Sequence, residues 1–208
     1  MPDVNSIELS DWLIQHTPEL CIEINSHRKP LSNGLHLASR FATDLETGLI
    51  FDYLPESMFL TVINRSDFAR TLVLDKWTCN SDGRQAVFAK HATRSAGYIA
   101  TFIDQGYCFN AGEWNFPDAP LRGLHARNRV YEGVTGSESF DPWIERIEKR
   151  ITERVFDDLI REIPPEWYDD DLDAVMRLAE QLYKRRTGVP ELLLAAKNTT
   201  RHPFPNRM

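Results

Sequence analysis

Five oxygen-bearing side chains gather in the middle of the chain: Asp75, Asn80, Asp82, Gln85 and Asp104. Carboxylate and amide oxygens are the ligands of a hard cation such as Mg²⁺, and no imidazole or thiolate ligand set accompanies them. Phosphoryl transfer needs such a metal to neutralise the phosphates and a spare carboxylate to orient the attacking hydroxyl. The residue types therefore favour metal-assisted phosphate chemistry.

A β-hairpin is predicted to bring these side chains together. Residues 84–90 and 97–103 are β-prone runs, and the polar segment 91–96 separates them. If the turn is centred near residues 93–94, the residue across from Asp104 is about residue 83. Asp104 is then expected beside Asn80, Asp82 and Gln85, and Asp75 lies just upstream, where a helix must end before the Asp82-Gly83 turn.

The remaining pattern predicts an α+β fold with a helical carboxy-terminal half. Ser6 is expected to cap a helix reaching residue 16, followed by a strand at 21–24 and a mainly loop segment at 26–48. Apolar spacing predicts helices over 58–63, 68–74, 140–161, 171–186 and 191–197. We expect three parts, namely 1–54, a helical lobe over 55–198, and an irregular tail over 199–208.

Composition narrows the function classes. Acidic residues outnumber basic ones by 31 to 24, and the net charge of −7 argues against broad binding to nucleic acid or anionic membrane. Three scattered cysteines suggest neither a disulfide framework nor a zinc site. Since neither a signal peptide nor a membrane span is evident in the sequence, we expect a protein of the reducing cytoplasm.

The motif resembles the catalytic and metal-binding loops of HipA-like kinases. Residues 80–85 (Asn-Ser-Asp-Gly-Arg-Gln), a strand, a turn, a second strand and residues 103–106 (Ile-Asp-Gln-Gly) follow in the order of that family. The resemblance implies a kinase-like fold, ATP and Mg²⁺ as cofactors, Asp82 as catalytic base, and Asp104 as metal ligand. It also implies an acceptor, protein or small molecule, which the sequence does not identify.

Two departures from the family leave alternatives open. The second metal ligand is Gln85 or Asn80, and another alignment makes Asp75 the base and Asn80 the ligand. The Gly-rich loop and the strand lysine of the nucleotide lobe are absent from the sequence, so that lobe is expected to be largely missing. Ser39 and Arg40 are the candidates for phosphate contact, although an ordinary loop explains them as well.

Two other functions compete with a kinase. The missing nucleotide lobe also fits a pseudokinase-like binding or regulatory module without turnover. A metal-dependent phosphohydrolase would use the same oxygens. Asp-Gly and Asp-x-Gly segments, taken singly, are ordinary turn formers.

Overall fold

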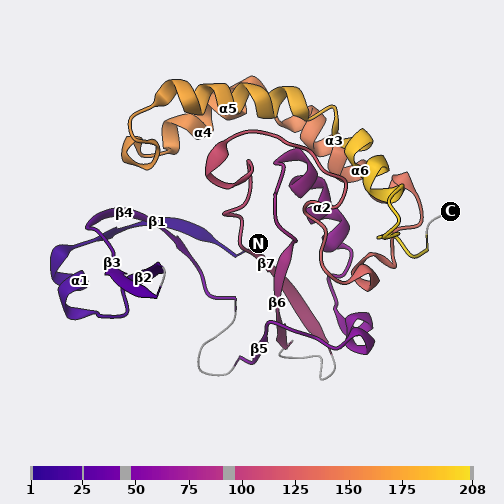
Figure 1. Cartoon of the computed structure of the whole chain (residues 1–208), viewed down its shortest axis with the longest axis horizontal. Helices are drawn as coiled ribbons and strands as arrows, with labels where there is room; N and C mark the ends of the chain where they lie inside the picture. The colour runs from indigo at the N-terminus through magenta and orange to yellow at the C-terminus, as the bar shows by residue number, and fades with distance from the viewer. Residues whose placement is uncertain (1, 25, 43–47, 91–96, 207–208) are drawn as a thin grey trace. The chain divides into compact units, whose positions relative to one another are not determined.

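The computed structural model describes residues 2–24, 26–42, 48–90 and 97–206 (Figure 1). The chain forms two compact units, Met1–Phe41 and Ala42–Met208. Small antiparallel sheets and several helices make the fold α+β, as the sequence predicts.

The first unit holds two separate strand pairs. Strand β1 (Val4–Leu9) pairs antiparallel with β4 (Gly34–Ser39), and β2 (Cys21–Ile24) pairs antiparallel with β3 (His27–Pro30). The short helix α1 (Asp11–His16) lies between β1 and β2 in the sequence. The strand predicted at 21–24 is therefore confirmed.

Two predictions for this unit are wrong. The helix begins after Ser10, whose hydroxyl accepts a hydrogen bond from the Leu13 amide at 3.2 Å, while the residues from Ser6 onward belong to β1. The described residues of the segment 26–48 include β3 and β4, so more of them lie in strands than in loop, and residues 43–47 lie outside the described residues. Its turn-forming residues lie at strand ends: Pro30 ends β3, and Gly34, with a φ of +110°, begins β4.

The second unit contains a three-stranded antiparallel sheet in the order β5-β6-β7. Strands β6 (Gln85–Lys90) and β7 (Tyr98–Ile103) form the predicted hairpin, and β5 (Ile50–Phe51) adds to the free edge of β6. The predicted turn, 91–96, lies outside the described residues. Gln85 pairs with Ile103, so continuing the register places Arg84, one residue beyond the expected position 83, opposite Asp104.

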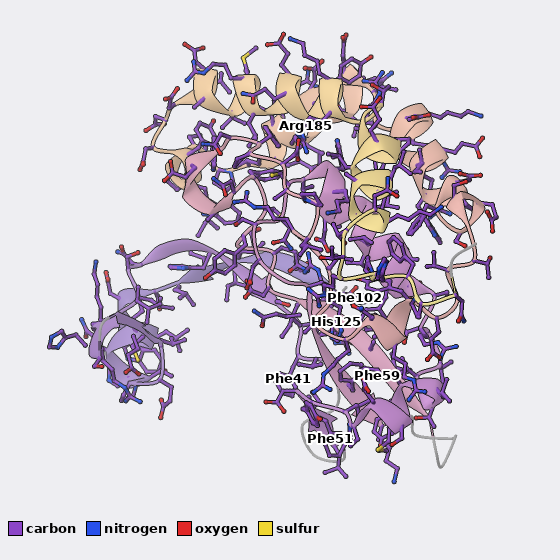
Figure 2. The ribbon with its side chains drawn as sticks, turned by 45° about the vertical axis from the view of Figure 1, so that its right-hand side comes forward. Phe41, Phe51, Phe59, Phe102, His125 and Arg185 are labelled. Carbon is purple, nitrogen blue, oxygen red and sulfur yellow. The ribbon has the colours of Figure 1, made fainter. Side chains whose placement is uncertain are left out.

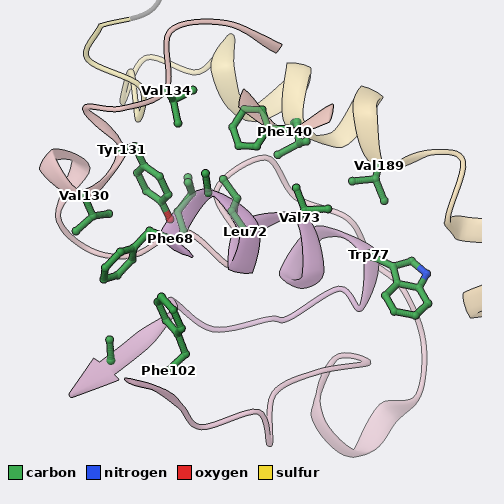
Figure 3. Packing of buried hydrophobic residues seen from close by; sticks show 14 of the residues in the cluster. Phe68, Leu72, Val73, Trp77, Phe102, Val130, Tyr131, Val134, Phe140 and Val189 are labelled. Atoms are coloured by element: carbon green, nitrogen blue, oxygen red, sulfur yellow. The ribbon is translucent and has the colours of Figure 1, made fainter. Parts of the chain in front are cut away.

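Helix α2 (Asp67–Trp77) is the centre of the second unit, and the 3-10 turn η1 (Glu56–Thr61) precedes it, where a helix had been predicted. Its buried residues include Phe68, Leu72, Val73 and Trp77, so nearly the whole helix surface is covered. Figure 3 shows Phe68 and Leu72 between Phe102 and the chain segments that carry Tyr131 and Phe140, with Trp77 at the far end of the helix. The end of α2 is thus a fixed point for the residues that follow it.

The described part of this unit continues with the α-helices α3 (Asp141–Arg150), α4 (Glu153–Glu162), α5 (Leu172–Arg185) and α6 (Val189–Lys197). The single helix predicted over 140–161 is wrong, because Ile151 leaves the helical conformation and Thr152 caps a new helix by accepting from the Val155 amide. The tail is irregular as predicted but packed, since Phe204 contacts the rings of Tyr131 and Phe140.

Within the described ranges, none of the helices is both long and apolar enough to cross a membrane.

Candidate active site

Asp75 lies in the last turn of α2 and forms a buried ion pair with Arg84. The two residues are only 1% and 3% exposed. Arg84 Nε donates to Asp75 Oδ2 at 2.9 Å, its Nη2 donates to Oδ1, and Asn80 Nδ2 also donates to Oδ1 at 3.0 Å. Burial raises the pKa of Asp75, and the hydrogen bond and charge of Arg84 oppose that rise. Both oxygens of this carboxylate are therefore occupied by protein donors.

Asn80 connects this pair to the next turn. It is 1% exposed, and its main-chain amide donates to the Asp75 carbonyl at 2.9 Å. Its side-chain oxygen accepts from the Asp82 amide at 3.1 Å, the pattern of an Asx turn. Asn80 therefore shapes the turn that presents Asp82, and its oxygen is already used within the protein.

Asp82, Gln85 and Asp104 form an exposed cluster at the open end of the hairpin. Gln85 Nε2 lies 3.1 Å from Asp104 Oδ2 and 3.4 Å from Asp82 Oδ2. The hairpin therefore does bring the two carboxylates to a single amide group, as the register argument predicts. Unlike Asp75, these side chains face solvent and can receive a ligand.

Asp104 has a left-handed backbone, with a φ of +57°, directly after β7. Such a conformation is uncommon outside glycine, is better tolerated by Asp, and concentrates at functional sites. Arg84 stabilises it, because Nη1 donates to the carbonyls of Ile103 at 2.9 Å and Asp104 at 3.2 Å. The buried guanidinium thus fixes the backbone under an exposed carboxylate.

The loop 121–124 is hydrogen-bonded to the backbone of both Asp82 and Arg84. The Gly123 amide donates to the Asp82 carbonyl at 3.0 Å, and the Arg84 amide donates to the Leu124 carbonyl at 3.2 Å. Gly123 has a φ of +75°, and a Cβ at this position would lie 2.5 Å from Cβ of Asp75. Only glycine fits between the buried ion pair and the turn that carries Asp82.

Sequence reasoning did not assign roles to Arg84 or Gly123. Arg84 entered only as part of the motif in residues 80–85, and no local pattern drew attention to Gly123. An arginine placed between a predicted turn and a predicted strand was the available signal for Arg84. The contact of Gly123 with Asp75 joins segments far apart in the chain, so no local signal could have indicated it.

Ser39 and Arg40 belong to the first unit, at the end of β4. The Arg40 amide donates to the Asp3 carbonyl at 2.8 Å, and its guanidinium lies 3.8 Å from the exposed Asp3 carboxylate. A phosphate contact by these two residues stays a prediction.

The donor set at the exposed cluster suits Mg²⁺ bound together with a phosphate. In the part of the chain that the structure describes, no group of three or more His, Cys, Asp or Glu side chains is arranged to hold a metal ion. Asp104 supplies a carboxylate, Gln85 can present its amide oxygen after rotation of the amide, and the carboxylate of Asp82 lies beside them. Mg²⁺ commonly takes only one or two protein carboxylates and completes its octahedron with water and phosphate oxygens.

Two of the cavities in the second unit lie away from the exposed cluster. One, of about 440 Å³, is lined by η1, α2 and α3 residues including Leu60, Ala69 and Trp143. The other, of about 450 Å³, is lined by residues including Phe140, Leu193 and Phe204. None of the five predicted site residues lines either cavity.

Comparisons of the chain with protein-family models, curated proteins and solved structures gave no significant match. The function is therefore inferred from the geometry of the exposed cluster and from the motif in residues 75–106.

Proposed function

We propose that this protein is a HipA-like kinase that transfers a phosphoryl group from Mg–ATP to a hydroxyl acceptor. The observation that carries the proposal is the meeting of Asp82, Gln85 and Asp104 at one exposed end of the β6–β7 hairpin. A base and a metal-binding carboxylate beside each other are the essential protein groups of phosphoryl transfer.

The burial pattern supports Asp82 as the base. Asp82 is exposed and Asp75 is saturated by Arg84 and Asn80, so only Asp82 can reach an acceptor hydroxyl without breaking the buried pair. The same reasoning favours Gln85 over Asn80 as the second oxygen near the metal, because the Asn80 oxygen is bonded to the Asp82 amide. Asp104 then holds Mg²⁺.

The outward face of the hairpin supports a nucleotide as the phosphate donor. Cross-strand pairs on this face are Gln85 with Ile103, Val87 with Thr101, and Ala89 with Ile99. The opposite face carries Phe88 and Phe102, which are buried in the core. A phosphate group held at Gln85 and Asp104 leaves the exposed Ile99 and the partly exposed Val87 and Ile103 along the strands, on which a purine base can rest, while Ala89 on the same face is buried.

Calorimetry of ATP binding with and without Mg²⁺ tests the donor site. We expect Mg²⁺-dependent binding to be lost in Asp104→Asn and retained in Asp157→Asn, the same change at an exposed position of α4. Binding that ignores Mg²⁺, or that survives Asp104→Asn unchanged, would contradict the proposed site.

Product analysis separates the competing functions. We expect ADP and a phosphorylated acceptor with the wild type, and loss of both with Asp82→Asn while ATP binding persists. Metal-dependent ATP binding without any turnover would favour the pseudokinase-like module, which the missing Gly-rich loop and strand lysine motivate. Release of free phosphate alone would favour a phosphohydrolase.

A further inference from the structure

Lys76 holds a buried ammonium group against three main-chain carbonyls. The residue is 4% exposed, and Nζ donates to the carbonyls of Pro120 and Arg122 at 2.8 Å and of Ala119 at 3.5 Å. Burial lowers the pKa of Lys76 to about 8, and the charge of Asp75 partly offsets this effect. Keeping a charge here at neutral pH costs stability, which points to a role other than filling the core.

The carbonyls that Lys76 binds belong to the loop that supports the site. Directly after them, Gly123 donates to the Asp82 carbonyl and Leu124 accepts from the Arg84 amide. Residues 119–123 therefore connect the Lys76 ammonium to the backbone of Asp82. Carbonyls in this segment accept from Nζ, and the Gly123 amide at its end donates to the Asp82 carbonyl. Among the described residues, the hydrogen-bond partners of Lys76 Nζ are these loop carbonyls and not the side chains of the exposed cluster.

Arg185, which lies in helix α5 and is labelled in Figure 2, binds both the end of α2 and Asp118. Its guanidinium donates to the carbonyls of Lys76 and Trp77, both at 3.0 Å, and so satisfies the end of α2. It also makes a two-pronged ion pair with Asp118, at 2.7 and 2.8 Å, just before the carbonyls that Lys76 binds. The loop is thus attached to the end of α2 at both Asp118 and residues 119–122.

We propose that Lys76 is a positioning residue of the phosphoryl-transfer site, which fixes the backbone of Asp82 by holding the loop 119–124. The neighbouring Asp75 acts on the other carboxylate, because its partner Arg84 binds the Asp104 carbonyl. One turn of α2 then sets the relative position of base and metal ligand. This inference rests on the proposed kinase function only for the catalytic consequence, and its structural part is independent of it.

Amide hydrogen exchange, measured by NMR without nucleotide, tests the structural part. In Lys76→Met we expect exchange of the Gly123 and Arg84 amides to rise at least tenfold, because the loop loses its attachment. Lys76→Gln keeps two N–H donors and is expected to give a smaller rise, and it remains informative if the Met variant does not fold. Lys149→Met, an exposed position of α3, is the matched control.

Three results would overturn the proposal: no change at Gly123 and Arg84, a change limited to the Arg122 amide, or an equal rise at β7 amides such as Ala100. The last result would show that Lys76 acts only on global stability.

Steady-state kinetics test the catalytic part. We expect Lys76→Met to lower kcat at least tenfold with the KM for ATP within twofold of wild type, since the metal ligand Asp104 is untouched. Partial recovery in Lys76→Gln is expected for a positioning role. An unchanged kcat, or a loss confined to KM, would overturn it. If the wild type transfers no phosphate, the proposed function fails, while hydrogen exchange still decides whether Lys76 positions Asp82.

Discussion

The five side chains predicted as one cluster separate into two regions with opposite properties. Asp75 and Asn80 are buried, and every oxygen that they could offer to a metal is bonded to Arg84 or to the Asp82 amide. Asp82, Gln85 and Asp104 are exposed, and the side-chain amide of Gln85 lies within hydrogen-bond distance of both carboxylates. Spacing brought the residues to the same end of the hairpin, but burial determined which of them remain available for chemistry.

The two regions depend on each other. Arg84 is part of the buried pair, yet it also binds the carbonyls of Ile103 and Asp104. A buried polar network is rigid when all its groups are hydrogen-bonded, because any movement that breaks a bond leaves an unpaired polar group in the core. The buried region therefore supplies the fixed geometry that exposed side chains alone do not have.

The largest effect on stability is expected from breaking the buried pair. Arg84→Met leaves the Asp75 carboxylate without its counter-ion, which should lower the free energy of unfolding by about 3–5 kcal/mol. Urea denaturation followed by circular dichroism measures the change. Lys149→Met, which breaks the exposed pair with Glu145, should leave the denaturation midpoint unaltered. If Arg84→Met changed the free energy of unfolding as little as Lys149→Met does, the buried and exposed regions would not differ in their contribution to stability.

A smaller loss of stability is expected from a change at Gly123, where the loop 121–124 lies against Asp75. Gly123→Ala forces a side chain into a left-handed backbone and against Asp75, and we expect a loss of about 2–4 kcal/mol in urea denaturation. Gly112→Ala is the control, since a Cβ there meets no atom within 4 Å. Equal stability of the two variants would show that the loop is free to move away from Asp75.

Acid should destabilise the second unit through His125. This residue packs among the rings of Phe59 and Phe68, and Figure 2 labels it close to Phe59 and Phe102. Burial lowers the pKa of His125 to about 4. In the unfolded chain this histidine binds a proton at its ordinary pKa near 6.5. The stability that comes from a neutral, buried His125 is therefore complete above pH 6.5 and is lost as the pH falls to about 4.

The expected loss from His125 is about 3 kcal/mol, and it should appear as a steeper decline of stability in wild type than in His125→Gln between pH 7 and 4.5. Denaturation midpoints across this range give the slopes. His27→Gln, an exposed change in β3, should keep the wild-type slope. Parallel slopes for wild type and His125→Gln would rule out this source of pH dependence.

The smallest effect on stability is expected in the exposed region. Asp82→Asn should change the free energy of unfolding by less than about 0.5 kcal/mol, because no buried group loses a partner. Phosphoryl transfer should nevertheless fall by about 10²–10⁴-fold, the usual contribution of a catalytic base. Parallel denaturation and kinetic measurements on one preparation test both statements. A large loss of stability would place Asp82 with the buried region.

Local patterns in the sequence determined a substantial part of this protein. Alternating β-prone runs predicted the hairpin, and the spacing of apolar residues predicted the core of α2 and the helices near the carboxy terminus. Hairpin register then placed Asp104 near Asp82 and Gln85. These features follow from the period of each element, which neighbouring residues specify.

Where local signals compete, the sequence was insufficient. Both Ser6 and Ser10 can cap a helix, and strand pairing with residues 34–39 decided for Ser10. The apolar stripe continues across Ile151, yet Thr152 begins a second helix.

Only the tertiary structure decided which carboxylates are buried. Asp75 follows an apolar stretch and Asp82 lies in a polar Asn-Ser-Asp-Gly turn, but nothing local in the sequence shows that Asp75 binds the guanidinium of Arg84 or packs closely against Gly123. These contacts join α2, the start of β6 and a distant loop. Because the availability of an oxygen depends on what packs over it, the exposed carboxylates could be told from the buried one only after those segments had been brought together.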